Sequence, residues 1–196
     1  MRSKHPYCPY IPEDASKLII GTMPPHRFCI KPQVLYEKDV NFYYGSEDNC
    51  FWELLSEVTG TELSRDNSET AVQERKTLLE RLNIGITDIV ETCIHFNGKS
   101  DDASLKDKSW KPLEELLENN PTIDTLIYTS TYVRSWMNRY ADKGYHEWED
   151  KKSKRAGSVI INGKRYRVIV LYSPSRNALR RVNTQKRFMQ YKSVFR

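Results

Sequence analysis

The chain has 196 residues, a mass of 23.1 kDa and a formal net charge of +5. This length fits one domain with a substantial hydrophobic core, and we expect a single domain over residues 1–196. No stretch approaches the roughly 20 consecutive apolar residues of a membrane span, and the first residues lack the apolar block of a signal peptide. We therefore expect a cytoplasmic protein without membrane contacts.

Four apolar runs have the character of strands: residues 17–21, 84–90, 123–129 and 166–172. Their apolar residues follow one another without the alternation of a half-exposed strand. Such runs are typical of strands that are buried on both faces of a parallel sheet.

Helical patterns lie between these strands. The segment NCFWELLSEVTG at 49–60 has apolar residues at helical spacing and ends at Gly60, a natural stop for a helix. A second pattern covers 68–83, and we expect further helices at 112–119, 131–141 and 184–195.

The resulting order, β-α-α-β-α-β-α-β-α, predicts an α/β fold. Its layers are α/β/α, around a central, mainly parallel four-stranded sheet. The Asn162-Gly163 pair predicts a hairpin turn, so the last strand gains a short antiparallel partner. Residues 22–48 and 142–157 are predicted loops, and the first is long enough to suggest a function.

Ligands of open α/β sheets bind beyond the carboxyl ends of the strands. Here these ends carry small, polar or proline-rich sequences: Gly21-Thr22-Met23-Pro24, Thr87-Asp88, Thr129-Ser130 and Ser173-Pro174-Ser175. We expect the first and last of them to form the rim of a binding site.

Charge is unevenly distributed along the chain. Residues 151–196 contain fourteen Lys or Arg and no Asp or Glu, whereas all 26 acidic residues precede them. A basic segment on an acidic body is typical of a protein that binds a polyanion. The alternative is a basic surface that is simply solvated.

The four cysteines stand at 8, 29, 50 and 93, never as a close pair. Zinc and iron–sulfur sites usually use closely spaced cysteines. We expect these residues to be reduced and to contribute mainly to packing, with no metal site and no cofactor.

Four blocks of the sequence carry a family resemblance. They read IIGTMPP at 19–25, NFYYGSEDNCFWELLSEVTG at 41–60, GITDIVE at 85–91 and VIVLYSPSRNALRRV at 168–182. In this order they resemble motifs of the uracil-DNA glycosylase superfamily, and most closely its mismatch-specific and hypoxanthine-DNA glycosylase-like branches. The resemblance spans roughly residues 5–195, and it implies a monomer that acts on DNA.

Two positions depart from the superfamily's usual pattern. Met23 stands where most branches carry an Asp or Asn that positions water, and a thioether cannot take a proton. Ser173 stands where a His or Asn is common. The hypoxanthine-type branch also lacks the first carboxylate, and its resemblance implies a catalytic role for Asn49.

The resemblance also implies a pocket for a flipped base. It places Tyr44 as the aromatic ring that stacks on the base, with the pocket formed by Gly21, Thr22, Met23, Pro24 and Ser173. Two simpler roles stay open, since Tyr44 can pack under its loop and Asn49 can cap the helix that follows. Main-chain N–H groups of the stiff turn at 22–25 are candidates to stabilise the departing base.

Two further residues are candidates for the chemistry. Asp88, at the end of the second strand, is the nearest carboxylate for activating water, although such a residue can also cap a helix or pair with Arg. His26, just after the prolines, can donate to the base or to a phosphate, or lie on the surface.

The last motif is the predicted DNA-binding element. Hydroxyl groups and cations there suit phosphates, and Asn177 or a neighbour lies where relatives insert a side chain into the gap left by the flipped base. The residues are Ser175, Arg176, Asn177, Arg180 and Arg181.

These observations favour a DNA N-glycosylase that removes uracil or hypoxanthine with water as nucleophile. A non-catalytic nucleic-acid-binding relative is the second hypothesis, since Met23 and Ser173 replace expected groups. A nucleotide-handling enzyme of another α/β class is the third, and the lack of a Gly-rich phosphate motif counts against it.

Overall fold

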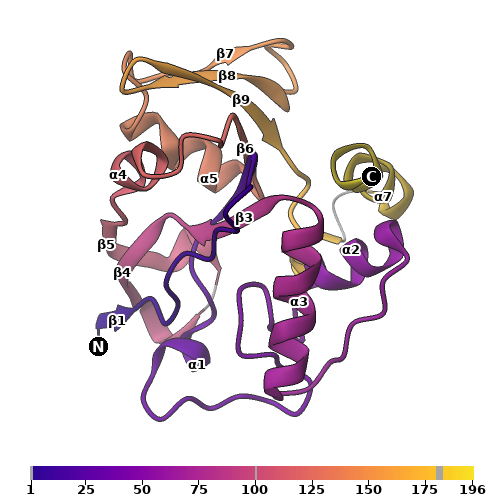
Figure 1. Ribbon diagram of the computed structural model, residues 1–196. Coiled ribbons are helices and arrows are strands. Elements are labelled where there is room, and N and C mark those ends of the chain that lie inside the picture. The colour runs from indigo at the N-terminus through magenta and orange to yellow at the C-terminus, as the bar shows by residue number, and fades with distance from the viewer. Residues whose placement is uncertain (1, 100, 180–182) are drawn as a thin grey trace.

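The computed structural model describes residues 2–99, 101–179 and 183–196. Its central sheet has six strands in the order β3-β2-β6-β9-β8-β7 (Figure 1). The first four are parallel neighbours, and the last two are antiparallel. Their bounds are β2 (Lys17–Gly21), β3 (Ile84–Asp88), β6 (Thr125–Tyr128), β9 (Lys164–Val170), β8 (Ala156–Ile161) and β7 (Glu147–Trp148).

Alternate residues of the parallel strands face opposite layers of helices. In β2, Leu18 and Ile20 join one core cluster and Ile19 joins the other, as the two-residue period of a strand requires. One cluster is completed by α4 (Leu113–Glu118) and α5 (Thr131–Trp136), and the other by α2 (Phe51–Thr59), α3 (Glu69–Arg81) and α7 (Thr184–Phe195). The predicted α/β/α arrangement with a mainly parallel sheet is confirmed.

Helix ends follow local sequence rules. α2 ends at Gly60, whose φ of 66° is the left-handed conformation that glycine adopts without strain. α3 begins after Ser68, whose side chain accepts a hydrogen bond from the N–H of Ala71. The predicted helix over 131–141 is shorter than expected, because α5 ends at Trp136 and a 3-10 turn, η3 (Met137–Arg139), follows.

A second sheet was not predicted. It has three antiparallel strands in the order β1-β4-β5, namely β1 (Arg2–Lys4), β4 (Val90–His95) and β5 (Leu105–Trp110). The predicted strand over 84–90 is therefore two strands. The chain leaves the first sheet at Ile89, whose N–H donates to the carbonyl of Gly21, and enters the second sheet at Val90.

The remaining elements are short. They are α1 (His26–Cys29), η1 (Phe96–Gly98), η2 (Asp102–Ser104) and α6 (Arg176–Leu179). The segment 142–157, predicted to be a loop, contains β7 and the start of β8. In the part of the chain that the structure describes, no helix combines the length and apolar character that a membrane crossing needs.

Candidate active site

The predicted rim segments lie along one edge of the central sheet. Gly21 is paired with Asp88 in register, and the N–H of Thr129 donates to the carbonyl of Ile20. β2 and β9 are separated only by β6, so their carboxyl ends are about 10 Å apart at the usual strand spacing. The corner at 22–25 and the corner at 173–175 therefore share this edge.

Tyr44, Asp88 and Gly21 meet at the end of β2. A Cβ atom added to Gly21 would lie 2.1 Å from the Tyr44 hydroxyl oxygen and 2.2 Å from Asp88 Oδ1. The Tyr44 hydroxyl lies 2.8 Å from Thr129 Oγ1, and its ring stacks on Phe51 with centroids 4.5 Å apart. Only glycine at position 21 leaves room for both polar groups.

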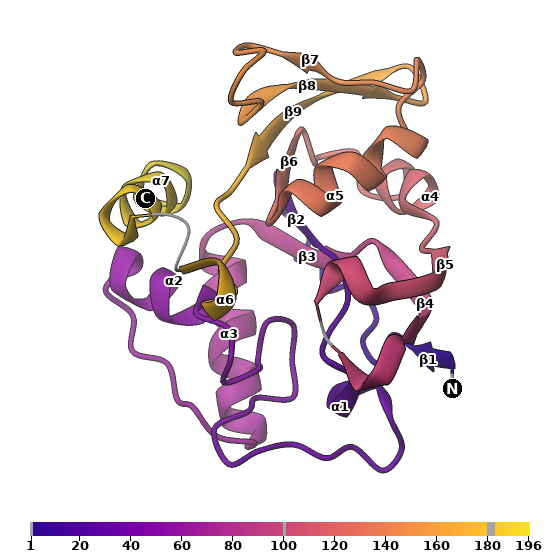
Figure 2. The ribbon, with the colours of Figure 1, turned by 180° about the vertical axis from the view of Figure 1, so that it is seen from behind.

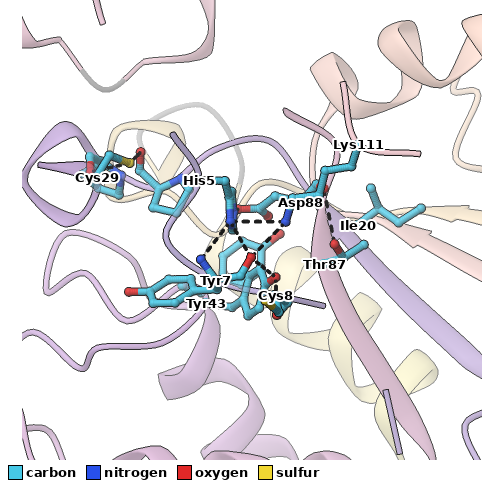
Figure 3. Close-up of polar contacts among 12 residues, drawn as sticks. His5, Tyr7, Cys8, Ile20, Cys29, Tyr43, Thr87, Asp88 and Lys111 are labelled. Atoms are coloured by element: carbon cyan, nitrogen blue, oxygen red, sulfur yellow. Dashed lines mark hydrogen bonds and ion pairs between the residues drawn. The ribbon is translucent and has the colours of Figure 1, made fainter. Parts of the chain in front are cut away.

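Asp88 is held by a histidine from the start of the chain. His5 Nε2 lies 2.9 Å from Asp88 Oδ2, and both side chains are buried (Figure 3). His5 Nδ1 is within hydrogen-bond distance of both the N–H and the carbonyl of Tyr7. When the N–H of Tyr7 donates to Nδ1, Nε2 carries the ring proton and donates to Asp88 Oδ2. One carboxylate oxygen is then fixed, and the other, Oδ1, points toward Gly21.

Lys111 contacts the other ring nitrogen of His5, Nδ1. Its Nζ lies 3.2 Å from His5 Nδ1 and donates to the carbonyl of Tyr7 at 3.2 Å. Burial lowers the pKa of this lysine, and the negative charge of Asp88 opposes the change. The ammonium group and Asp88 thus contact different nitrogens of the same imidazole ring.

A second carboxyl group reaches the same edge from η2. Burial raises the pKa of Asp102 to about 6, and the charge of Asp88 acts in the same direction. The Thr22 side chain and Lys108 oppose this rise in the pKa. Sequence reasoning assigned no role to Asp102 or His5: Asp102 lies in a segment without a motif, and His5 begins a segment that resembles the family without marking the histidine itself.

The start of α2 packs directly on the last corner. Asn49 and Ser175 form an antiparallel bridge, and the N–H of Cys50 donates to the carbonyl of Pro174 at 2.9 Å. The Asn49 Oδ1 atom accepts a hydrogen bond from the N–H of Phe51 at 2.9 Å. Asn49 is therefore the half-exposed residue that joins the two motifs, and Cys50 is the N-cap of α2.

Tyr44 and Asn49 line a hollow with a volume of about 90 Å³. It opens between the segment 38–46 and helices α2 and α3, and its wall includes the buried Arg75, whose pKa burial lowers to about 10. Of the six residues predicted to bind the base, Tyr44 lines this hollow, whereas Gly21, Thr22, Met23, Pro24 and Ser173 lie outside it.

Comparisons with known proteins bear on this geometry. No protein-family profile matches the chain. A hypoxanthine DNA glycosylase from Methanosarcina barkeri is 27% identical over 128 residues, which cover 64% of this chain and 70% of that protein. A solution NMR structure of a candidate uracil DNA glycosylase from Methanosarcina acetivorans superposes with a TM-score of 0.63 and 19% identity, and covers 100% of this chain and 98% of the other.

The chain is thus similar in sequence to a hypoxanthine DNA glycosylase, and it shares the fold of the candidate uracil DNA glycosylase. The sequence relative carries the name of the branch that the motifs favoured. The match in fold covers the whole chain, including both proline corners.

In this uracil-DNA glycosylase-like fold, the first corner is largely internal. Met23 is 8% exposed and belongs to the core cluster beneath α4 and α5. The carbonyl of Pro24 lies 3.3 Å from His95 Nε2, and the ring of His26 packs edge-on against that of His95 at 5.2 Å. Burial and the nearby His26 lower the pKa of His95.

The predicted DNA-binding residues are only partly described. The Arg176 guanidinium donates to the carbonyl of Glu47 and to Glu53 Oε1, at 3.0 and 2.8 Å. The N–H of Ser175 donates to Ser173 Oγ at 3.3 Å. Asn177 belongs to α6, which lies beside α2 (Figure 2), and Arg180 and Arg181 lie outside the described residues.

Within residues 2–99, 101–179 and 183–196, no three or more His, Cys, Asp or Glu side chains are grouped so that they could hold a metal ion. The four cysteines all have free thiols, and burial raises the pKa of Cys29 to about 12 and that of Cys93 to about 11.

Proposed function

We propose that the chain is a monofunctional DNA N-glycosylase that hydrolyses the N-glycosidic bond of a deaminated base, uracil or hypoxanthine. The two relatives point to a function of the DNA-glycosylase type. The observation that carries the proposal is the carboxylate of Asp88, which a buried histidine orients at the edge where both proline corners end.

Asp88 is the proposed general base. A general base must be held within reach of the proton that it removes, and His5 fixes Oδ2 while Oδ1 stays directed at the end of β2. In the proposed step, a water molecule transfers a proton to Asp88 as its oxygen bonds to C1′. The bond between C1′ and the base nitrogen breaks, and the base leaves with the electron pair.

Asn49 is the proposed reader of the base. Its Oδ1 atom is already bound to the N–H of Phe51, so the Nδ2 group is the end that can donate to a ligand. Uracil and hypoxanthine each carry a carbonyl where cytosine and adenine carry an amino group. A donor at this position favours the deaminated bases.

The first corner is proposed to stabilise the departing base. Prolines have no N–H, so the donors of the turn at 22–25 are the main-chain N–H groups of Thr22 and Met23. Donors that are fixed before the reaction stabilise developing negative charge most effectively. Asp102, beside Thr22, supplies negative charge near the cation-like sugar when it is ionised.

One assay tests the proposal. The protein is incubated with labelled duplexes that contain uracil, hypoxanthine or xanthine, and alkali-labile abasic sites are counted. We expect abasic product from at least one lesion, and at least about a hundredfold less from Asn49→Ala. We expect no covalent adduct with borohydride, because the Lys111 amine is held by His5 Nδ1 and the carbonyl of Tyr7.

A non-catalytic nucleic-acid-binding role is the alternative, and the position of Met23 favours it. The residue that usually positions water is here a thioether in the core. Tight binding of every duplex with no abasic product would support this alternative and contradict the glycosylase.

A further inference from the structure

The turn between β7 and β8 carries a concentrated positive charge. Residues 149–155 read EDKKSKR, with Lys151, Lys152 and Lys154 exposed and Arg155 half-buried. None of these four cations takes part in an ion pair with a described residue. Their charge is therefore available to a partner.

Strand pairing places this turn at the candidate active-site edge. β8 runs antiparallel to β9 with Ala156 opposite Ile169, and the N–H of Val170 donates to the carbonyl of Arg155 at 2.8 Å. The turn thus lies at the carboxyl end of β9 (Figure 2). Ser173 is three positions after Val170, so the chain between them spans at most about 10 Å.

Several contacts fix the turn in place. The Asp150 carboxylate accepts hydrogen bonds from the N–H groups of Lys152 and Ser153, and an Arg134 N–H donates to the carbonyl of Lys154 at 3.2 Å. These bonds hold the lysines on an ordered turn, which lowers the entropic cost of binding.

Arg155 ties the turn to the last corner. Its guanidinium donates to the carbonyl of Leu171 at 2.8 Å and lies 3.9 Å from the ring centroid of Tyr172. Lys186 approaches the same ring at 5.7 Å. Tyr172 directly precedes Ser173, so the basic turn and the corner form one continuous surface.

We propose that the turn 149–155 binds the DNA backbone in addition to the residues of the last corner, 173–175. Because the Arg155 guanidinium bonds to the carbonyl of Leu171, two residues before Ser173, we expect the lysines to contact phosphates near the one bound at the corner. Binding of the turn to DNA does not depend on the proposed function. Only the position of the bound phosphates relative to a lesion rests on it.

The test compares two variants of equal charge. One combines Lys151→Gln, Lys152→Gln and Lys154→Gln. The control combines Lys143→Gln, Lys164→Gln and Arg165→Gln, which lie near the Asn162-Gly163 turn at the opposite end of the same hairpin. Thermal unfolding of both variants checks that each is folded.

Affinity for an undamaged 20-base-pair duplex is measured between 50 and 200 mM salt. Each lost phosphate contact lowers the slope of log K against log salt by about 1. We expect the slope of the test variant to fall by about 2 to 3 and that of the control by less than 1. Equal slopes for the two variants would overturn the proposal.

Duplex length gives a second measurement. Two lesion duplexes are compared. One keeps only two base pairs on the 5′ side of the lesion, and the other keeps only two base pairs on its 3′ side. We expect the native protein to lose affinity for one of them, and the test variant to lose less. Affinity for undamaged DNA measures the contribution of the turn even if no lesion is cleaved. If lesions are cleaved but the two variants have equal salt slopes, the binding role of the turn is refuted and the glycosylase proposal is not.

Discussion

The two proline corners use the same rigid device in different surroundings. The corner at 22–25 is internal: Met23 and Pro24 are buried, and the N–H of Val90 donates to the carbonyl of Thr22 at 3.2 Å. The corner at 173–175 rests on the start of α2, with Ser173 and Ser175 half-buried and the basic segment close by. The first corner has carboxyl groups beside it, and the last has cations. We infer that the first serves the chemistry and the last serves DNA binding.

Asp88→Asn is the variant with the largest expected effect. The amide keeps the shape of the carboxylate but cannot take a proton from water, and general-base catalysis is worth about a hundredfold to ten-thousandfold. We expect the single-turnover rate of base release to fall within that range while DNA affinity stays within about threefold. A rate within tenfold of the native rate would contradict the role of Asp88.

Gly21→Ala is expected to disturb the first corner next most strongly. The new methyl group must displace the Tyr44 hydroxyl and Asp88 Oδ1, both of which are ends of side chains. Overpacking of this kind costs about 1–3 kcal/mol of unfolding free energy. We expect base release to fall at least tenfold, and urea denaturation measures the loss of stability.

Asp102→Asn tests the second carboxyl group through pH. Because the pKa of Asp102 is about 6 in the folded chain and lower when unfolded, the folded state holds more protons between pH 4 and 6 and loses stability as pH rises through this range. Asparagine stays neutral at every pH. We expect the variant to be more stable than the native protein by about 1–3 kcal/mol at pH 8, with little difference at pH 4.

The same variant should alter the pH dependence of the reaction. Ionised Asp102 stabilises the cation-like sugar, so base release by the native protein should increase as pH rises through about 6. The Asp102→Asn profile should lack this increase. Identical profiles for the two proteins would remove Asp102 from the chemistry.

Arg176→Gln is expected to have the smallest effect. Its guanidinium already contacts Glu47 and Glu53 on a partly exposed surface, and such pairs contribute about 0–1 kcal/mol. We expect a loss of DNA affinity below about fivefold, measured by fluorescence anisotropy, and no change in the rate of base release. Glu53→Gln is the matched control, since it frees the same guanidinium.

The sequence predicted the parallel sheet because its strands are buried on both faces and therefore read as unbroken apolar runs. It also predicted that the corners at 22–25 and 173–175 lie at the same edge, since the carboxyl ends of parallel strands share one edge of a sheet. The second sheet was missed because β1 has only three residues and β4 continues from β3 after one residue, Ile89.

The residues that support the candidate site were harder to predict. His5 lies 83 positions from Asp88, in a segment with no strand or helix pattern before it. Asp102 sits in a polar turn whose composition is that of an ordinary loop. Nothing in the local sequence indicates that His5 becomes buried or that Asp102 becomes partly buried, because both depend on contacts between distant segments.

We infer that the corner at 22–25 serves the chemistry and the corner at 173–175 serves DNA binding. The most direct test measures the rate of base release and the DNA affinity separately on one lesion duplex. The variants are Asp88→Asn and the double substitution Arg180→Ala with Arg181→Ala. We predict that the first lowers the single-turnover rate with affinity retained, and that the second lowers affinity and the salt slope with the rate at saturating protein retained. Parallel losses of rate and affinity in both variants would contradict the account.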